Sequence, residues 1–345
     1  MSVENKIPKD FYWKQYLFHN HDLVNVGIDN KEDAEFHYLQ HGESENRKYS
    51  AAPLCTRSIN KLIDLDISLK IFKNSLEAIV LLVTGNEITN GLYDRFCHEL
   101  EKRTDTTDIN FVVITKPSIS ESIDINFFKK FFNNVTVISL DIPIKDDSYY
   151  YANQNKTYST TSDYGYYSGP NYTFYESFRY LKRYNTCLFL ECDCYFGNNW
   201  IDRLKNFVEY SGDFWICGSI FDGVLDYQHT TFNKRVDIIN THINGGTALY
   251  ATGNEDFVKF LEISEEYLKA YVKEVNAKVP YDHFIKESLD ISFRLFMKQN
   301  STIARFINRK YLVNNLILNY SNPESKNIEI SEIAKMYDFA VLHKK

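Results

Sequence analysis

The sequence predicts an α/β protein with a mostly parallel sheet and a small helical module at its N-terminus. From about residue 76 onward, short apolar runs alternate with segments of helical spacing, as in a sheet with connecting helices. The apolar runs are continuous, which is typical of strands that are covered on both faces. Before this region, aromatic residues cluster at spacings of three and four, which indicates short helices instead.

The N-terminal module is expected to comprise residues 1–56, and the α/β domain residues 57–345. Two apolar clusters, at residues 11–18 and 34–39, predict two short helices, and Gly42 is placed to close the second. Two short helices bury little surface alone, so the module should pack on the larger domain.

The remaining elements follow from the same patterns. A linker is expected over residues 50–58, and a helix or an extended connector over 59–69. The expected strands are 78–83, 111–114, 135–140, 186–190 and 214–217, and the expected helices are 92–100, 127–132, 174–184 and 200–208. Residues 145–172 are rich in Tyr and predict either a lid or binding loop, or a mobile surface excursion.

Composition excludes several classes of protein. The net charge is −7, so the basic surface of a nucleic-acid binder is missing. No run approaches about 18 apolar residues, so no transmembrane helix is expected. Six cysteines in 345 residues are too few for a disulfide scaffold, and the N-terminus lacks the apolar stretch of a signal peptide. These observations predict a cytoplasmic protein.

The most informative motif is an apolar run, residues 186–190, that leads into Glu191 and Asp193. The strand period of two predicts that both carboxylates share one face. Ligands of open α/β sheets bind at the carboxyl ends of strands, and two carboxylates there could hold a hard divalent cation. An ordinary turn at a strand end is the alternative.

Four other segments carry polar groups between apolar residues: Ser168–Asn171, Thr241–Tyr250 with its Asn-Gly-Gly turn, Pro280–His283 and Phe339–Lys345. Each of these segments could instead have a simple structural role. Asp282 could cap a helix, Asn171 could be a turn residue, and His343 could be solvated.

The order of strand, acid-x-acid, Asn-Gly-Gly turn, aromatic-Asp and terminal His resembles the GT-A glycosyltransferases. The segments Ser168–Asn171, Leu190–Cys194 and His242–Gly245 are similar to the subgroup found in large algal and amoebal viruses and in bacterial surface-glycan clusters. The N-terminal pattern resembles a short helical module of surface-polysaccharide enzymes, with matches at Asp22, Leu23, Gly27, Ala34, His37, Tyr38, Gly42, Glu45, Arg47 and Tyr49.

This resemblance implies roles for individual residues. Asp193 and His343 would bind Mn²⁺ or Mg²⁺, and Asp282 would face the reacting centre. The residues implied in binding the donor are Thr84, Gly85, Asn86, Asn171, Glu191, Asn244, Gly245, Gly246 and Lys345.

The implied activity is metal-dependent transfer of a hexosyl or deoxyhexosyl group from a nucleotide sugar, such as a UDP-sugar, to a glycan acceptor. The implied setting is surface or capsid glycan synthesis in the producing or host cell, or in association with the virion. The alternative is a non-catalytic protein that binds carbohydrate or nucleotide sugar through a degenerate site. A nicotinamide or S-adenosylmethionine enzyme is disfavoured because residues 84–91 have too few glycines. An aspartyl-phosphate phosphatase is disfavoured because Glu191 stands at the position of the nucleophile.

Overall fold

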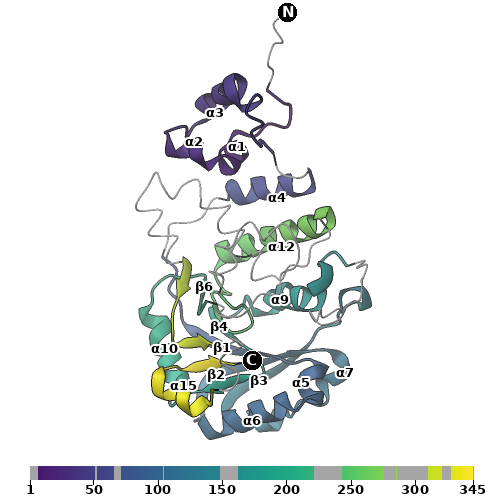
Figure 1. Cartoon of the computed structure of the whole chain (residues 1–345). Helices are drawn as coiled ribbons and strands as arrows, with labels where there is room; N and C mark the ends of the chain where they lie inside the picture. Colours follow the sequence, from purple (N-terminus) through teal and green to yellow (C-terminus); the bar gives the residue numbers. More distant parts are fainter. Residues whose placement is uncertain are drawn as a thin grey trace, which may run out of the picture.

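The structure is a computed structural model of the chain, and Figure 1 shows its arrangement. It describes residues 7–50, 53–65, 71–103, 105–147, 162–220, 243–275, 285, 310–320 and 328–344.

A seven-stranded mixed sheet forms the centre of the α/β domain, in the order β3-β2-β1-β4-β7-β6-β8. Its strands are β1 (Leu76–Leu82), β2 (Thr107–Thr115), β3 (Phe132–Ser139), β4 (Thr186–Leu190), β6 (Ile216–Gly218), β7 (Leu249–Tyr250) and β8 (Tyr311–Val313). Strand β7 is antiparallel to both neighbours, and the other pairs are parallel. The predicted fold class, a mixed and mostly parallel Rossmann-like sheet flanked by helices, is therefore confirmed.

A second, three-stranded sheet lies beside the first, in the order β5-β10-β9. Its strands are β5 (Cys194–Phe196), β9 (Ile317–Asn319) and β10 (Val341–His343). It joins segments that are far apart in the sequence.

Helices cover both faces of the large sheet. Successive residues of β1 accordingly point into two different apolar cores. Ala78 and Val80 face the core that α9 (Ser168–Leu181) and α12 (Glu255–Val275) complete. Ile79 and Leu81 face the core that α6 (Leu92–Arg103) and α10 (Trp200–Tyr210) complete. The remaining short helices are α5 (Gly85–Thr89), α7 (Pro117–Ser120), α8 (Ile125–Phe128), η2 (Ile144–Asp146), η3 (Gly165–Tyr167) and α15 (Ile330–Met336). Within the described part of the chain, no helix is both long and apolar enough to span a bilayer.

The N-terminal module contains α1 (Trp13–His19), α2 (His21–Asn25), α3 (Lys31–His37) and the π-helical turn η1 (Tyr38–Gly42). Helix α4 (Pro53–Ile63) follows and lies between the module and α12, on which it packs (Figure 1). Apolar residues of the module share one core with α9 and α12. The module is therefore packed on the larger domain, as expected.

Several residues that carry the module's resemblance hold it together. Arg47 forms ion pairs with Asp22, at 2.6 Å, and with Glu45, at 2.7 Å. Gly42 is buried in η1, and a Cβ there would lie 2.7 Å from the Tyr16 hydroxyl and 2.8 Å from the Tyr38 ring. The residues of the N-terminal sequence pattern therefore stabilise the fold of the module itself.

Several predicted boundaries are wrong in detail, and three of them have a bearing on the fold. The predicted linker is helical from Pro53, because α4 has an apolar face to bury and proline is tolerated in a first helical turn. The predicted helix 127–132 ends at Phe128, and Phe132 already begins β3. Helix α9 begins at Ser168, six residues before the predicted start at residue 174.

Candidate functional site

The site lies where the direction of strand order changes. From β1 the chain continues to β2 and β3 on one side, and then crosses to β4 on the other side of β1. The carboxyl ends of β1 and β4 are adjacent, since Leu81 pairs with Leu190 in parallel register. Such a switch point is where open α/β sheets bind their ligands.

Glu191 and Asp193 lie in the turn between β4 and β5. The backbone N–H of Cys194 donates to the Glu191 carbonyl at 3.3 Å and closes this turn. The expected strand period is therefore the wrong reason for their proximity, because β4 ends at Leu190. The turn, rather than a continued strand, brings the two carboxylates together.

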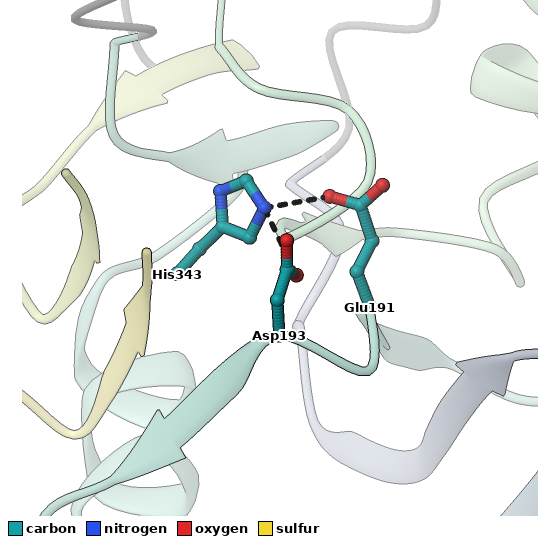
Figure 2. A group of neighbouring side chains, drawn as sticks. All are labelled: Glu191, Asp193 and His343. Atoms are coloured by element: carbon teal, nitrogen blue, oxygen red, sulfur yellow. Dashed lines mark ion pairs between the residues drawn. The ribbon is translucent and has the colours of Figure 1, made fainter. Parts of the chain in front are cut away.

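His343 reaches the same place from the C-terminal strand β10, which pairs with β5 so that His343 lies opposite Cys194. Figure 2 shows its ring pointing toward both carboxylates. His343 Nε2 lies 2.9 Å from Glu191 Oε2 and 3.1 Å from Asp193 Oδ1. The sequence prediction that places these three residues in one site is consistent with this geometry.

The electrostatics of the cluster favour a cation. His343 is fully buried, and burial is the largest single influence on its pKa, which it lowers. The carboxylates of Asp193 and Glu191 together outweigh burial and raise the pKa of His343 to about 9. Positive charge at Nε2 is thus stabilised by two carboxylates in a partly desolvated place.

The other ring nitrogen of His343 faces two asparagines. Nδ1 lies 2.7 Å from Asn319 Oδ1 and 2.9 Å from Asn244 Nδ2. Asn244 Oδ1 accepts a hydrogen bond from the backbone N–H of Gly246 at 3.1 Å. Gly246 in turn lies directly against Glu191, where a Cβ would come within 2.6 Å of Oε2. The Asn-Gly-Gly turn therefore supports both the histidine and one carboxylate.

The donor set fits a divalent metal ion. One oxygen each from Glu191 and Asp193 and one nitrogen of His343 all lie within 4.8 Å of one another. Carboxylate oxygens suit Mg²⁺ and Mn²⁺, and an imidazole nitrogen favours transition-metal ions over Mg²⁺. The three residues could therefore hold such an ion, with Asn319 and Asn244 behind the histidine.

The other predicted site residues lie in separate parts of the chain. Thr84, Gly85 and Asn86 follow β1 at the same edge of the sheet, where Thr84 caps α5 through the Glu87 carboxylate. Gly245 is buried, and its carbonyl accepts a hydrogen bond from Tyr250 at 2.8 Å.

Asn171 is also fully buried, and its Nδ2 donates to the Tyr164 carbonyl at 3.1 Å. Asp282 and Lys345 lie outside the described residues.

Sequence reasoning missed Asn319. It is 95% buried at the end of β9, and its partner across the β9–β10 ladder is His343. No sequence motif marks it, because its position depends on a parallel pairing between two short strands. Its role becomes visible only when the second sheet is in place.

No protein-family model matches the chain, and no curated protein matches its sequence. Among solved structures, mouse xyloside xylosyltransferase 1 is similar at 11% identity and a TM-score of 0.46, covering 78% of this chain and 97% of that chain. The galactosyltransferase LgtC, solved with donor and acceptor sugar analogues, is similar at 16% identity and a TM-score of 0.43, covering 77% and 86%. The mannosyltransferase Ktr4p of S. cerevisiae is similar at 9% identity and a TM-score of 0.41, covering 67% and 73%. Likeness at this level does not carry function, which has to be argued from the site.

Proposed function

We propose that this protein is a metal-dependent glycosyltransferase of the GT-A type, which transfers a sugar from a nucleoside-diphosphate donor, such as a UDP-sugar, to a glycan acceptor. The observation that carries the proposal is the convergence of Glu191, Asp193 and His343 at the switch point of the sheet. An acidic chain without a glycine-rich phosphate loop needs a cation to bind a diphosphate, and this cluster can hold one. The resemblance of the motifs suggests surface or capsid glycans as acceptors and a hexosyl or deoxyhexosyl group as the cargo.

The residues have separate tasks in this mechanism. Asp193, His343 and Glu191 would hold Mn²⁺ or Mg²⁺, which when bound neutralises the charge of the diphosphate leaving group. Thr84, Gly85 and Asn86, which follow the neighbouring strand β1, would contact the nucleotide.

The reaction breaks the bond between the anomeric carbon and the diphosphate oxygen and forms a bond from that carbon to the acceptor oxygen. Asp282, assigned by resemblance, would accept the proton of the acceptor hydroxyl or stabilise the oxocarbenium-like carbon. The Asn-Gly-Gly turn, Asn171 and Lys345 complete the proposed set of donor contacts.

The intact cluster argues against the non-catalytic alternative, because a degenerate site has no reason to keep two carboxylates against a buried histidine. The two functions differ in metal dependence. A catalyst should bind the donor tightly only with a divalent ion, whereas a binding protein with a degenerate site should ignore the ion.

The test compares Asp193→Asn with Asp94→Asn, which removes the same charge from an exposed position on α6. Thermal unfolding is followed with a panel of nucleotide sugars, with and without Mn²⁺, and release of the nucleoside diphosphate is measured with acceptor present. A donor at a hundred times its dissociation constant should stabilise the wild type and the Asp94 variant by about 2.7 kcal/mol, only with metal. Asp193→Asn should lose both this stabilisation and transfer. Equal activity of the two variants would disprove the assignment.

A further inference from the structure

Two buried asparagines compete for one nitrogen of His343. Nδ1 lies 2.7 Å from the carbonyl oxygen of the Asn319 side chain and 2.9 Å from the amide nitrogen of Asn244. All three side chains are more than nine-tenths buried, so water does not substitute freely for either partner. Because Nδ1 either carries a proton or offers a lone pair, it can satisfy only one asparagine at a time.

The two asparagines therefore favour opposite states of the ring. Asn319 Oδ1 can only accept, so it stabilises a ring that carries a proton on Nδ1. Asn244 Nδ2 can only donate, so it stabilises a ring with a lone pair on Nδ1 and a proton on Nε2. The orientation of Asn244 is fixed, since its Oδ1 already accepts from the Gly246 N–H.

Only the first of these states can bind a metal at Nε2. With the proton on Nδ1, the neutral ring directs the Nε2 lone pair at the space between Glu191 and Asp193. With the proton on Nε2, the ring instead donates to a carboxylate and blocks the ion.

We propose that Asn319 is a positioning residue for the metal, which acts by holding the Nδ1 proton of His343 and so keeping Nε2 available as a ligand. Asn244 opposes it, because its Nδ2 favours a ring with a lone pair on Nδ1. The proposal rests on the metal site of the proposed function, but it concerns residues that the sequence motifs do not assign to this task.

The backbone fixes Asn319 in this position. His343 and Asn319 are paired across the parallel β9–β10 ladder, and the backbone N–H of Tyr320 donates to the His343 carbonyl at 2.8 Å. The side chain of Asn319 is thus held beside the ring by main-chain hydrogen bonds. Partners of this kind behind a metal-binding histidine typically change metal affinity by 10- to 100-fold.

The experiment uses two variants of nearly the same size. Asn319→Leu removes the acceptor, and Asn319→Asp keeps an acceptor at the same place. Asn134→Leu, at an exposed position on β3, is the matched control for the leucine. Mn²⁺ affinity is measured by calorimetry without any nucleotide. The Nδ1 proton of His343 is followed by ¹⁵N-edited NMR in Mg²⁺-loaded protein and in metal-free protein at a pH where the ring is neutral, and thermal unfolding establishes that each variant is folded.

Asn319→Leu should weaken Mn²⁺ binding by about 10- to 100-fold and should lose the protected Nδ1 proton signal, whereas Asn319→Asp should retain both. Asn134→Leu should change neither. The proposal is overturned if folded Asn319→Leu binds Mn²⁺ within about threefold of the wild type, if Asn319→Asp fails to retain the affinity, or if the wild type shows no protected Nδ1 proton. The NMR signal is read in metal-free protein, so it tests the role of Asn319 even where Mn²⁺ binding, and with it the proposed function, fails.

Discussion

The substitution Gly246→Ala should displace the Glu191 carboxylate while leaving Glu191 itself unchanged. An alanine Cβ at this position would lie 2.6 Å from Oε2 and 2.7 Å from Oε1 of Glu191, closer than real contacts allow. Something must move. The Glu191 carboxylate is the end of a flexible side chain that is 33% exposed, so it should rotate away from His343 into solvent.

The stability cost of Gly246→Ala should be small. Among the described glycines, positive φ angles occur at Gly27, Gly91, Gly165 and Gly212 but not at Gly246, so alanine meets no backbone strain there. The clash is with a movable side chain rather than with backbone, and we expect a change in the free energy of unfolding of about 1 kcal/mol or less. If the proposed metal site is right, metal affinity should fall at least tenfold, or about 1.4 kcal/mol, because one of the three proposed protein ligands is lost.

Calorimetric titration with Mn²⁺ tests this, in a cycle with Glu191→Ala. If the alanine acts only by displacing the carboxylate, it should weaken binding in the wild type and have no effect once Glu191 is shortened. The reasoning fails if Gly246→Ala binds Mn²⁺ as tightly as the wild type. It also fails if the alanine weakens binding equally in both backgrounds, because the turn itself would then have moved.

Two further predictions concern buried charges. The pKa of His343 is raised to about 9 in the folded metal-free protein, so its charged form stabilises the fold at pH values below its unfolded pKa of about 6.5. That stability should be lost as the pH rises through about 9. Chemical unfolding in EDTA should therefore show a difference in the free energy of unfolding between wild type and His343→Gln that shrinks as the pH rises. A difference that stays constant with pH would contradict this prediction. Lys310 and Asp213 form a buried ion pair, so Lys310→Met should cost about 3–5 kcal/mol by leaving the carboxylate unpaired. The double variant with Asp213→Asn should recover part of this loss, and failure to recover would mean that the pair is not the cause.

Much of the sheet could be predicted because burial leaves a direct mark on the sequence. The central strands β1 and β4 are covered on both faces, and continuous apolar runs report this. The carboxylates are predictable because they interrupt such a run abruptly. Strand ends and short helices were predicted less well, since the start of α9 and the end of α8 depend on tertiary packing rather than on local pattern.

Local sequence pattern does not identify His343 or Asn319 as site residues. His343 entered the prediction only through resemblance, because one histidine near a terminus has no distinctive spacing. Neither local pattern nor the resemblance indicates Asn319 as a site residue. Its contact with His343 spans 24 positions of sequence and exists only because β9 and β10 pair in parallel. Asn319 supports the site through His343, and its position depends on how two strands pair rather than on a local sequence motif.

The three-stranded sheet explains why the site depends on the whole domain. Its strand β5 directly follows Asp193, β10 carries His343, and β9 carries Asn319. Gly197 ties β5 to the approach of β10 through a backbone hydrogen bond to the Ala340 carbonyl at 2.9 Å. A chain that has formed only the large sheet would present two carboxylates at the end of β4 without the histidine nitrogen that completes the proposed metal site. The metal should therefore bind tightly only after the C-terminal strands have docked, and metal binding should stabilise that docking in return, because a ligand that prefers the complete site shifts the equilibrium toward it.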